Sequence, residues 1–160
     1  MKKVIVTGAT GMIGASMIQQ MLADGIQVTA VCRPNSKKRK NLMNHNLLDI
    51  FECDINDLSK LSEQLPHDYD TFYHFAWDGT YGASRDDVML QEANVKNTLI
   101  AVETAHDLGC SVFVGAGSQA EYGYVNGELS DDIPKNPIKG YGIAILKAGK
   151  LSALLCEQYG

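Results

Sequence analysis

The sequence predicts a doubly wound α/β fold, in which a parallel sheet has five strands in the order 3-2-1-4-5. Short apolar runs alternate along the chain with longer segments in which apolar residues recur every three or four positions. Strands that alternate with helices form parallel sheets through right-handed crossovers. A glycine-rich turn joins the first strand to the first helix. The 160 residues suffice for a single domain with a buried core, covering residues 1–160.

The first strand is predicted from the apolar run Val4-Ile5-Val6, and the first helix from the periodic segment Met12–Ala23, which Asp24-Gly25 ends. Further strands are predicted at 27–31, 47–53, 71–75 and 111–115. Further helices are predicted at 37–42, from the turn at 54–57 through 65, at 85–108 and at 140–158. Segments 76–84 and 116–138 are expected to be irregular. The methionines at positions 12, 17, 21, 43 and 89 are interpreted as core side chains.

The first turn has the spacing G-x-x-G-x-x-G, with glycines at positions 8, 11 and 14. Gly8 permits a tight turn, Gly11 lets a pyrophosphate approach the backbone, and Gly14 lets the helix pack close to the strand. The start of the helix offers free N–H groups and a positive dipole end to an anion. The turn therefore predicts a phosphate site. The alternative is an ordinary turn between strand and helix that binds nothing.

Composition excludes several classes of protein. The net charge of −5 argues against a nucleic-acid partner, because such proteins are usually basic. The four cysteines are widely spaced, which favours buried thiols in a reducing cytoplasm over disulfides or a zinc site. The four histidines lack ligand spacing, so no metal is expected. No apolar stretch approaches membrane-spanning length, and a strand so close to Met1 leaves no room for a signal peptide.

Several motifs follow one another along the chain: Thr7-Gly8-Ala9-Thr10-Gly11-Met12-Ile13-Gly14, Cys53-Asp54-Ile55, His74-Phe75-Ala76, Glu92-Ala93-Asn94-Val95-Lys96-Asn97-Thr98, Gly117-Ser118-Gln119-Ala120-Glu121-Tyr122-Gly123 and Tyr141-Gly142. This ordered set resembles the NAD-dependent epimerase/dehydratase family of extended short-chain dehydrogenases/reductases, whose fold is Rossmann-like. The resemblance implies an enzyme that transfers hydride between a nicotinamide cofactor and a carbon of a nucleotide-sugar.

The resemblance also implies a role for each matching position. The cofactor would be bound by the turn residues Gly8, Thr10, Gly11, Met12, Ile13 and Gly14, by Asp54 and Ile55 at the adenine, and by Phe75, Ala76 and Trp77 at the nicotinamide riboside. Asn94 would support the site from a helix. Ser118 would hydrogen-bond the substrate oxygen, and Tyr141 would move the proton during hydride transfer and contact the cofactor.

Two features depart from the family pattern. The family continues Tyr141 into Tyr-x-x-x-Lys, but Ile145 stands where the lysine is expected. Lys147 lies six residues after the tyrosine and is expected to point elsewhere, because six residues turn a helix by about 120° from full turns. We therefore expect activity to be severely reduced unless another cation replaces the lysine. The chain also ends where family members continue into a carboxyl-terminal substrate domain, which would be absent here.

Other positions bear on the cofactor and on the reaction. At the end of the second strand, where NAD-binding proteins place an acid, the sequence has Cys32 followed by Arg33. An arginine there can bind a 2′-phosphate, which favours NADP over NAD, the alternative. The basic residues that follow, Lys37 to Lys40, are better interpreted as a solvated helix face. Gln119 and Ala120 stand where dehydratases carry Asp and Glu, which favours an epimerase or reductase.

Three hypotheses follow from these patterns. The first is an epimerase or reductase that forms a homodimer through the helices at 85–108 and 140–158, as the family does. The second is a non-catalytic module that binds NADP(H) and acts through a protein partner, which Ile145 favours. The third is an incomplete product of a gene for an ordinary enzyme.

Overall fold

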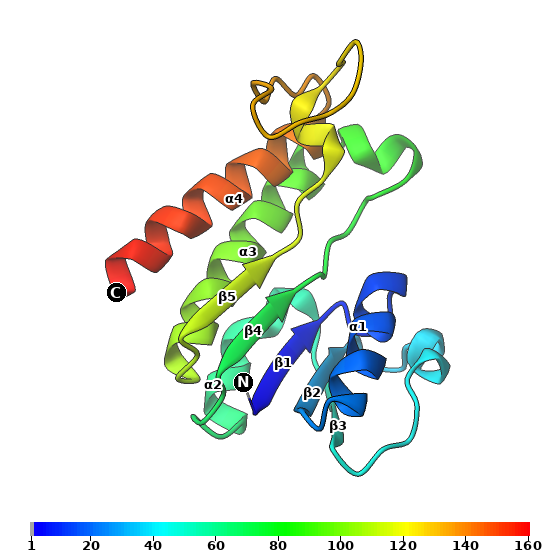
Figure 1. The fold of residues 1–160 in the computed structure, drawn as a ribbon, viewed down its shortest axis with the longest axis vertical. Coiled ribbons are helices and arrows are strands. Elements are labelled where there is room, and N and C mark those ends of the chain that lie inside the picture. Colours follow the sequence, from blue (N-terminus) through cyan, green and yellow to red (C-terminus); the bar gives the residue numbers. More distant parts are fainter. Residues whose placement is uncertain (1) are drawn as a thin grey trace. The chain divides into compact units, whose positions relative to one another are not determined.

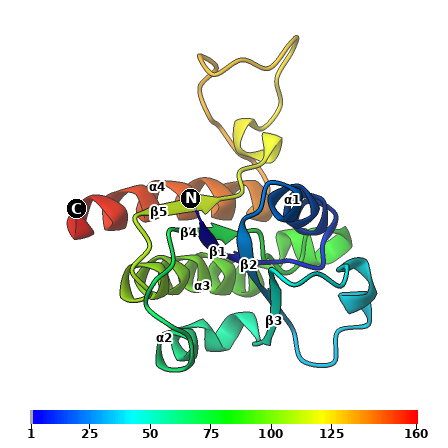
Figure 2. The ribbon, with the colours of Figure 1, turned by 60° about the horizontal axis from the view of Figure 1, so that its bottom comes forward.

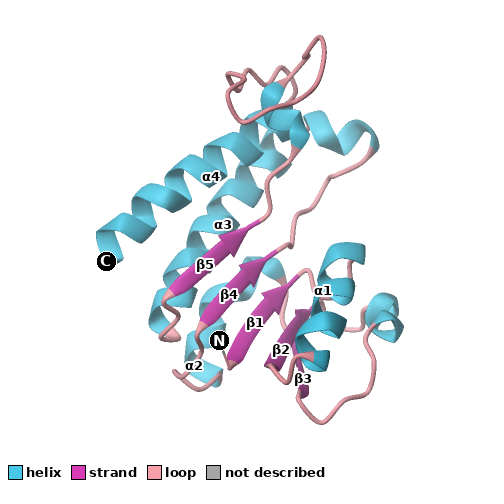
Figure 3. Ribbon diagram, viewed as in Figure 1, coloured by secondary structure: helices cyan, strands magenta, loops and turns pink. Residues whose placement is uncertain are grey.

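The structure is a computed structural model that describes residues 2–160. The chain divides into two compact units. The first unit runs to Ala76 and includes Ile100–Gly115, and the second consists of Trp77–Leu99 and Ala116–Gly160. Strands alternate with helical segments along the chain, as Figure 3 shows by colour. A single domain over 1–160 stays a prediction.

The first unit is built on a five-stranded parallel sheet, in the predicted order β3-β2-β1-β4-β5 (Figure 1). The strands are β1 (Lys3–Thr7), β2 (Gln27–Cys32), β3 (Leu48–Glu52), β4 (Thr71–His74) and β5 (Val112–Gly115). Ile5 of β1 pairs with Thr29 of β2 on one side and with Phe72 of β4 on the other. The central strand is buried on both faces, as expected for a continuous apolar run in a parallel sheet.

The two faces of the sheet carry different cores. Because successive strand residues point to opposite faces, Val4 and Val6 face one core and Ile5 faces the other. Helix α1 (Met12–Ala23) covers the first face with Ile18 and Leu22. Helix α2 (Leu61–Gln64) and the last residues of helix α3 (Val88–Asp107) cover the second. Figure 2 shows α1 and α2 on opposite sides of the sheet.

The helix expected from 54–57 through 65 is largely a 3-10 helix, Ile55–Lys60, which continues into the single turn of α2. Leu65 is extended because it precedes Pro66, so α2 ends at Gln64. The polar helix expected at 37–42 is also a 3-10 helix, Lys37–Asn41.

The second unit contains the 3-10 helices Gly82–Asp86 and Gln119–Tyr122, the first part of α3, and helix α4 (Gly140–Tyr159). Helix α3 begins at Val88 rather than near the expected residue 85. Val95 of α3 packs against Ala144 and Ala148 of α4, with Trp77 and Leu151 at the margin of this small core.

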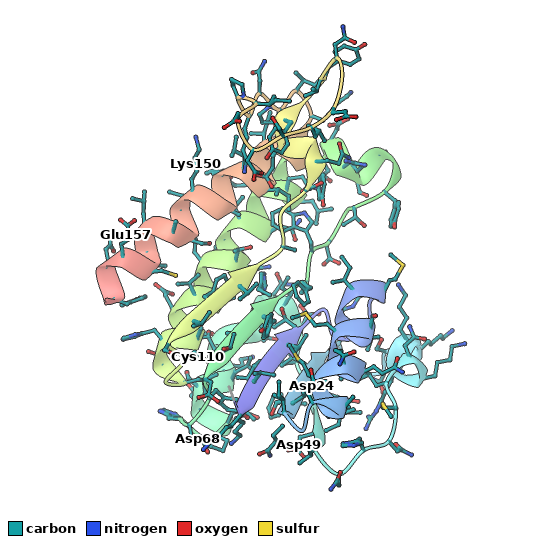
Figure 4. The ribbon with its side chains drawn as sticks, viewed as in Figure 1. Asp24, Asp49, Asp68, Cys110, Lys150 and Glu157 are labelled. Atoms are coloured by element: carbon teal, nitrogen blue, oxygen red, sulfur yellow. The ribbon has the colours of Figure 1, made fainter. Side chains whose placement is uncertain are left out.

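Several aspartates lie near the starts of the strands, where Lys3 pairs with Asp68. Asp24, Asp49 and Asp68 lie at this end of the sheet (Figure 4). Asp70 accepts the backbone N–H groups of Lys2 and Lys3 at 2.6 and 2.9 Å, and these hydrogen bonds lower the pKa of its carboxyl. The glycine turn and the basic segment 33–40 follow strand ends instead, so positive charge lies at the edge where open α/β sheets bind ligands.

Candidate functional site

Gly8 and Gly14 of the first turn are required by close backbone contacts, and Gly11 lies in a tighter than usual contact. Gly8 has φ of +67°, and a Cβ atom there would lie 2.5 Å from the carbonyl carbon of Phe75. A Cβ on Gly14 would lie 2.4 Å from the Gly8 oxygen, and one on Gly11 would lie 3.2 Å from it. The Gly11 N–H donates to the Gly8 carbonyl at 3.0 Å. The tight turn at Gly8 and the close helix packing at Gly14 are thereby confirmed.

The start of α1 presents backbone N–H groups that no side chain caps. Gly11 occupies the N-cap position without a side chain, and the first turn contains no acidic residue. Met12 is 87% exposed and Ile13 60% exposed, so the expectation that Met12 fills the core is wrong. The same expectation is wrong for Met43 and Met89, which are also exposed. The exposure of Met12 and Ile13 follows from their position in the first turn, which precedes the buried face of the helix. The carbonyl of Thr10 accepts the Asn41 side chain at 3.0 Å, which ties the turn to the segment after β2.

A pocket of about 590 Å³ follows the end of β2, lined by Arg33, Pro34, Asn35, Ser36, Lys37, Lys38 and Asp54. Burial raises the pKa of the neighbouring Cys32 thiol, so Cys32 is a neutral group at this strand end. The lining carries more positive than negative side chains, which suits an anionic ligand. Arg33 and Asp54, expected from the sequence to bind the cofactor, both line this pocket.

Asp54 starts the 3-10 helix that follows β3. Its Oδ1 accepts the backbone N–H of Asn56 at 3.0 Å and the side-chain amide of the same residue at 2.7 Å. Ile55 is 8% exposed and packs in the core with Leu58 and Leu61. The structure thus brings Asp54 to the pocket and places Ile55 within the core behind it.

The end of β4 is held against the glycine turn. The Phe75 N–H donates to the Thr7 carbonyl at 3.2 Å, and Phe75 and Ala76 contact Gly8. His74 is 3% exposed and its Nδ1 lies 2.9 Å from Thr7 Oγ1. Burial lowers the pKa of His74 to about 4, so the imidazole is neutral near pH 7. A neutral, hydrogen-bonded histidine therefore fixes the strand end beneath the turn.

In the second unit, two buried amides of α3 organise the segment that begins at Trp77. Asn94 accepts the Asp78 N–H at 3.0 Å and donates to the Asp78 carbonyl at 2.8 Å. Gln91 accepts the Trp77 indole N–H at 2.9 Å and donates to the carbonyls of Gly79 and Ser84, each at 3.0 Å. The supporting role expected of Asn94 thus has a physical basis in its two hydrogen bonds to the Asp78 backbone, called the Asn94 clamp below.

Ser118 begins the 3-10 helix Gln119–Tyr122 and takes part in a capping box. Its Oγ accepts the Ala120 N–H at 3.2 Å, while its own backbone N–H donates to Glu121 Oε1 at 2.8 Å. Glu121 is 6% exposed, and its Oε2 pairs with Lys135 at 2.6 Å. The cap uses a lone pair of Oγ, which leaves the Ser118 O–H able to donate to a ligand oxygen.

Tyr141 lies in the first turn of α4, with an aromatic ring and a guanidinium around it. The Trp77 ring meets it edge-on, with centroids 6.0 Å apart and planes at 89°. The Arg85 guanidinium carbon lies 4.6 Å from the centroid of the Tyr141 ring. Gly142 contacts the 3-10 helix that Ser118 begins, since a Cβ there would lie 2.3 Å from the Ala120 oxygen. Trp77, Tyr141 and the Ser118 turn are therefore assembled around the start of α4.

The chain matches the family model for the NAD dependent epimerase/dehydratase family over residues 4–160. It belongs to this family. The match confirms the resemblance inferred from the ordered motifs, and the observed sheet order confirms the Rossmann-like fold.

Relatives in the family share a quarter to a third of the sequence. The chain is 32% identical over 146 residues to the ADP-L-glycero-D-manno-heptose-6-epimerase of Nitratidesulfovibrio vulgaris, covering 86% of this chain and 44% of that protein. The UDP-glucuronic acid 4-epimerase of Bacillus cereus, solved with NAD, is 25% identical with a TM-score of 0.79, covering 98% of this chain and 53% of that one. MoeE5, solved with UDP-glucose and NAD, is 26% identical with a TM-score of 0.80, covering 96% and 48%. The chain spans about half the length of the curated relatives it matches.

The family's motif lysine is replaced by a buried apolar side chain. Ile145 lies one turn after Tyr141 in α4 and is 5% exposed. Lys147 pairs with Glu92 of α3 at 2.5 Å, which agrees with the expectation that it does not take the lysine's place. Arg85 is instead the cation whose contact with the Tyr141 ring the structure describes.

Sequence reasoning missed four residues that build this region, namely Arg85, Asp86, Gln91 and Glu121. The role of Gln91 could have been predicted from the sequence, because it precedes Asn94 by three residues and therefore lies on the same face of the helix. The role of Glu121 could also have been predicted, since Ser118-x-x-Glu121 is the capping-box pattern. The contacts of Arg85 and Asp86 with α4 join positions more than fifty residues apart, and no local pattern encodes them.

Two absences hold for residues 2–160, the part of the chain that the structure describes. No group of three or more His, Cys, Asp or Glu side chains in that range gathers as possible metal ligands. Within the same range, none of the helices combines the length and apolar character needed to cross a membrane.

Proposed function

We propose that the chain binds a nicotinamide dinucleotide and acts as a nucleotide-sugar epimerase or reductase. The observation that carries this proposal is the turn at Gly8, Gly11 and Gly14, in which close contacts at Gly8 and Gly14 leave no room for a side chain beside an uncapped helix start. A glycine turn of this kind, beside free N–H groups at a helix start, suits a pyrophosphate. Relatives solved with NAD support the class of cofactor.

The chemistry assigned to the chain is a proton transfer coupled to hydride transfer. Ser118 would donate its O–H to the reacting sugar oxygen, and Tyr141 would take the hydroxyl proton from that oxygen and later return it. The hydroxyl proton thus goes to Tyr141, and the two electrons of the C–H bond leave with the hydride. The bound cofactor supplies the hydride acceptor and donor.

The basic pocket supports NADP(H) as the preferred cofactor. NADPH differs from NADH by a 2′-phosphate, and Arg33, Lys37 and Lys38 line the pocket at the end of β2. The neutral Cys32 provides no carboxylate to bind a ribose diol or to repel that phosphate. NAD(H) is the alternative, and it is the cofactor present with the solved relatives.

The test is a titration of the purified chain with NADPH and NADH, followed by fluorescence of the single tryptophan, Trp77. We expect micromolar binding with NADPH at least about tenfold tighter, as one charge-assisted contact provides. Arg33→Ser should remove that difference and leave NADH binding unchanged. Tighter binding of NADH would overturn the NADP(H) preference alone. Failure of both ligands to bind would overturn the proposed function.

The second candidate is a non-catalytic dinucleotide-binding module that acts through a protein partner. The buried Ile145 at the lysine position favours it. The variant Ile145→Lys discriminates, with UDP-glucose and oxidised cofactor as the probe and absorbance of the reduced cofactor as the readout. Turnover that appears only in the variant indicates a disabled enzyme, and turnover in the parent supports the first proposal. Dinucleotide binding without turnover in either protein supports the module.

Assembly and location belong to the proposal as well. We propose a homodimer formed through α3 and α4, whose exposed apolar side chains include Met89, Ile143 and Leu154. The four cysteines are free thiols, which supports a reducing cytoplasm as the place where the protein works.

A further inference from the structure

We infer that Glu121 is the positioning residue of Ser118, and that Lys135 holds the Glu121 carboxylate in place. The inference deepens the proposed function and rests on it for its biological meaning, because Ser118 is assigned there to the sugar oxygen. Of the acidic side chains in residues 2–160, Glu121 alone is buried. Burying a carboxylate is costly unless hydrogen bonds and a cation compensate it, so both kinds of partner are expected around Glu121.

The Glu121 carboxylate lies against the backbone of Ser118. Its Oε1 accepts the Ser118 N–H at 2.8 Å, and the Glu121 N–H donates to the Ser118 carbonyl at 3.0 Å. Gly117 makes this approach possible, because a Cβ there would lie 2.9 Å from the same Oε1 atom. The peptide groups on both sides of the Ser118 Cα are thus held by one residue, which sets the direction in which the Ser118 side chain leaves the backbone.

The Ser118 hydroxyl takes up a defined position within this turn. Ser118 has an extended backbone, with φ of −148° and ψ of 145°, and its Oγ accepts the Ala120 N–H at 3.2 Å. A serine without these constraints would sample the other staggered χ1 rotamers. The backbone bonds from Glu121 and the bond from Ala120 therefore select together the rotamer that presents the O–H.

Lys135, from the irregular segment that precedes α4, satisfies the second oxygen of the carboxylate. Its Nζ donates to Glu121 Oε2 at 2.6 Å. This hydrogen bond is the main cause that raises the pKa of the Lys135 ammonium, so Lys135 stays charged near pH 7. The buried carboxylate thus has both the hydrogen bond and the cation that it needs.

The two partners explain why this position holds a carboxylate. The Ser118 N–H and the Lys135 ammonium are both donors, so the group between them must accept on two sides. A carboxylate accepts with both oxygens, whereas a glutamine amide accepts with its oxygen and donates with its nitrogen. An amide at this position would satisfy one donor and turn its N–H groups toward the other. Removing the Lys135 ammonium leaves a single donor, which an amide oxygen can satisfy.

The 3-10 helix that Ser118 begins also packs against the start of α4, which carries Tyr141. A Cβ on Gly142 would lie 2.3 Å from the Ala120 carbonyl oxygen, and these residues all belong to the second unit. Holding Ser118 within its turn therefore holds it relative to Tyr141 as well. In the proposed reaction both side chains act on one sugar oxygen, and Glu121 acts there through Ser118.

The experiment follows Ser118 by NMR in the chain without cofactor or substrate. Hydrogen exchange of the Ser118 amide reports its bond to Glu121, and the Hα–Hβ couplings of Ser118 report whether χ1 occupies one rotamer. The variants are Glu121→Gln and the same substitution combined with Lys135→Met. The matched control is Glu92→Gln, which alters the exposed ion pair with Lys147 in the same unit. Exchange of the Val95 amide in α3 reports on the unit as a whole.

We expect Glu121→Gln to accelerate Ser118 exchange at least about tenfold, as loss of a hydrogen bond to a charged acceptor predicts, and to average the Ser118 couplings over several rotamers. Adding Lys135→Met should slow that exchange again by at least about threefold, a rescue that general loosening of the unit would not produce. Glu92→Gln should leave Ser118 close to the parent, and Val95 should stay close to the parent in every variant.

Unchanged Ser118 exchange in Glu121→Gln, an equal change in Glu92→Gln or at Val95, or the lack of rescue overturns the inference. If Glu121→Gln does not fold, Gly117→Ala gives the comparison, because the added methyl group displaces the carboxylate while its charge is kept. Unchanged Ser118 exchange in Gly117→Ala then overturns the inference. Because dinucleotide binding is measured separately, failure of the Glu121 role is distinguished from failure of the proposed function.

Discussion

At the residue scale, the glycines of the first turn are set apart by what surrounds them. A Cβ on Gly14 would lie 2.4 Å from a backbone oxygen, and no flexible side chain could move away to relieve that contact. Gly149 of α4 also lies within a helix, but a Cβ there would meet nothing within 4 Å. Two glycines in similar backbone conformations therefore differ only in their surroundings.

Gly14→Ala is expected to destabilise the protein by about 2 kcal/mol, since the added methyl group overpacks the contact with the Gly8 carbonyl. It should also weaken NADPH binding, because relief of the contact moves the turn. Gly149→Ala should instead stabilise the protein by about 0.5 to 1 kcal/mol, as alanine restricts the unfolded chain. Urea unfolding measures both. Equal destabilisation by the two substitutions would contradict this account.

His74 makes the stability of the protein depend on pH. Its pKa is lowered to about 4 by burial, whereas an unfolded histidine titrates near 6.5. Above pH 6.5 both states are neutral at this residue, so it contributes nothing. As the pH falls from 6.5 to 4, the unfolded chain binds a proton that the folded protein does not, and the free energy of unfolding falls by up to about 3 kcal/mol.

His74→Asn should remove this dependence, because the amide can still hydrogen-bond Thr7 but does not titrate. Urea unfolding midpoints of both proteins at pH 7, 6, 5 and 4.5 test this pH dependence. The parent is expected to lose more stability than the variant at each step. Parallel curves for the two proteins would show that protonation of His74 is not responsible.

At the scale of elements, helix α3 acts as a support for the segment that begins at Trp77. The buried amides Gln91 and Asn94 satisfy backbone groups at residues 78, 79 and 84, which are not part of a strand or an α-helix. A polar face thus replaces the apolar face that a core helix usually presents.

Asn94→Ala is expected to cost about 2 kcal/mol, because it leaves the N–H and the carbonyl of Asp78 without their side-chain partner. Hydrogen exchange of the Asp78 amide should accelerate, and Trp77 fluorescence should shift toward that of exposed indole. Lys96→Ala, at an exposed position two residues along the same helix, is the control and should change neither signal. Unchanged exchange in Asn94→Ala would show that the clamp does not order this segment.

The sequence predicted every strand and long helix of the fold, and the errors have local physical causes. Helix α3 starts at Val88 because the Asp87 side chain caps it, accepting the Leu90 N–H at 3.1 Å. From the sequence alone, either Asp86 or Asp87 could have been this N-cap residue. The 3-10 helix at 55–60 escaped prediction because its apolar spacing fits an α-helix equally well. For the candidate site, motifs led to Ser118 and Tyr141, but Arg85 reaches Tyr141 only through tertiary packing.

At the scale of the whole molecule, α4 offers a face for association. Ile143, Lys150 and Leu154 lie along one exposed side of this helix, since seven and eleven residues return close to the same direction. Ile143 is 50% and Leu154 55% exposed. Figure 4 shows Lys150 and Glu157 projecting from the same helix.

Leu154→Glu is expected to weaken the proposed homodimer at least about tenfold, because a carboxylate replaces an apolar side chain at the interface. Light scattering across a dilution series measures the dimer fraction. Glu157→Gln, which removes a charge from the same helix, should leave it nearly unchanged. A parent protein that is monomeric throughout would refute the homodimer.

The ion pair between Glu121 and Lys135 closes a loop at its base, where Gly123 also lies against the Asn136 carbonyl. The loop, which projects in Figures 1 and 2, includes Tyr124 at 88% exposure and Gly127 with open space around it. A peptide inserted at Gly127 would extend a loop whose two ends are already fastened together. Gly127 is therefore a suitable attachment point for an epitope or fluorescent reporter, by which the protein could be followed while the glycine turn and Tyr141 remain unchanged.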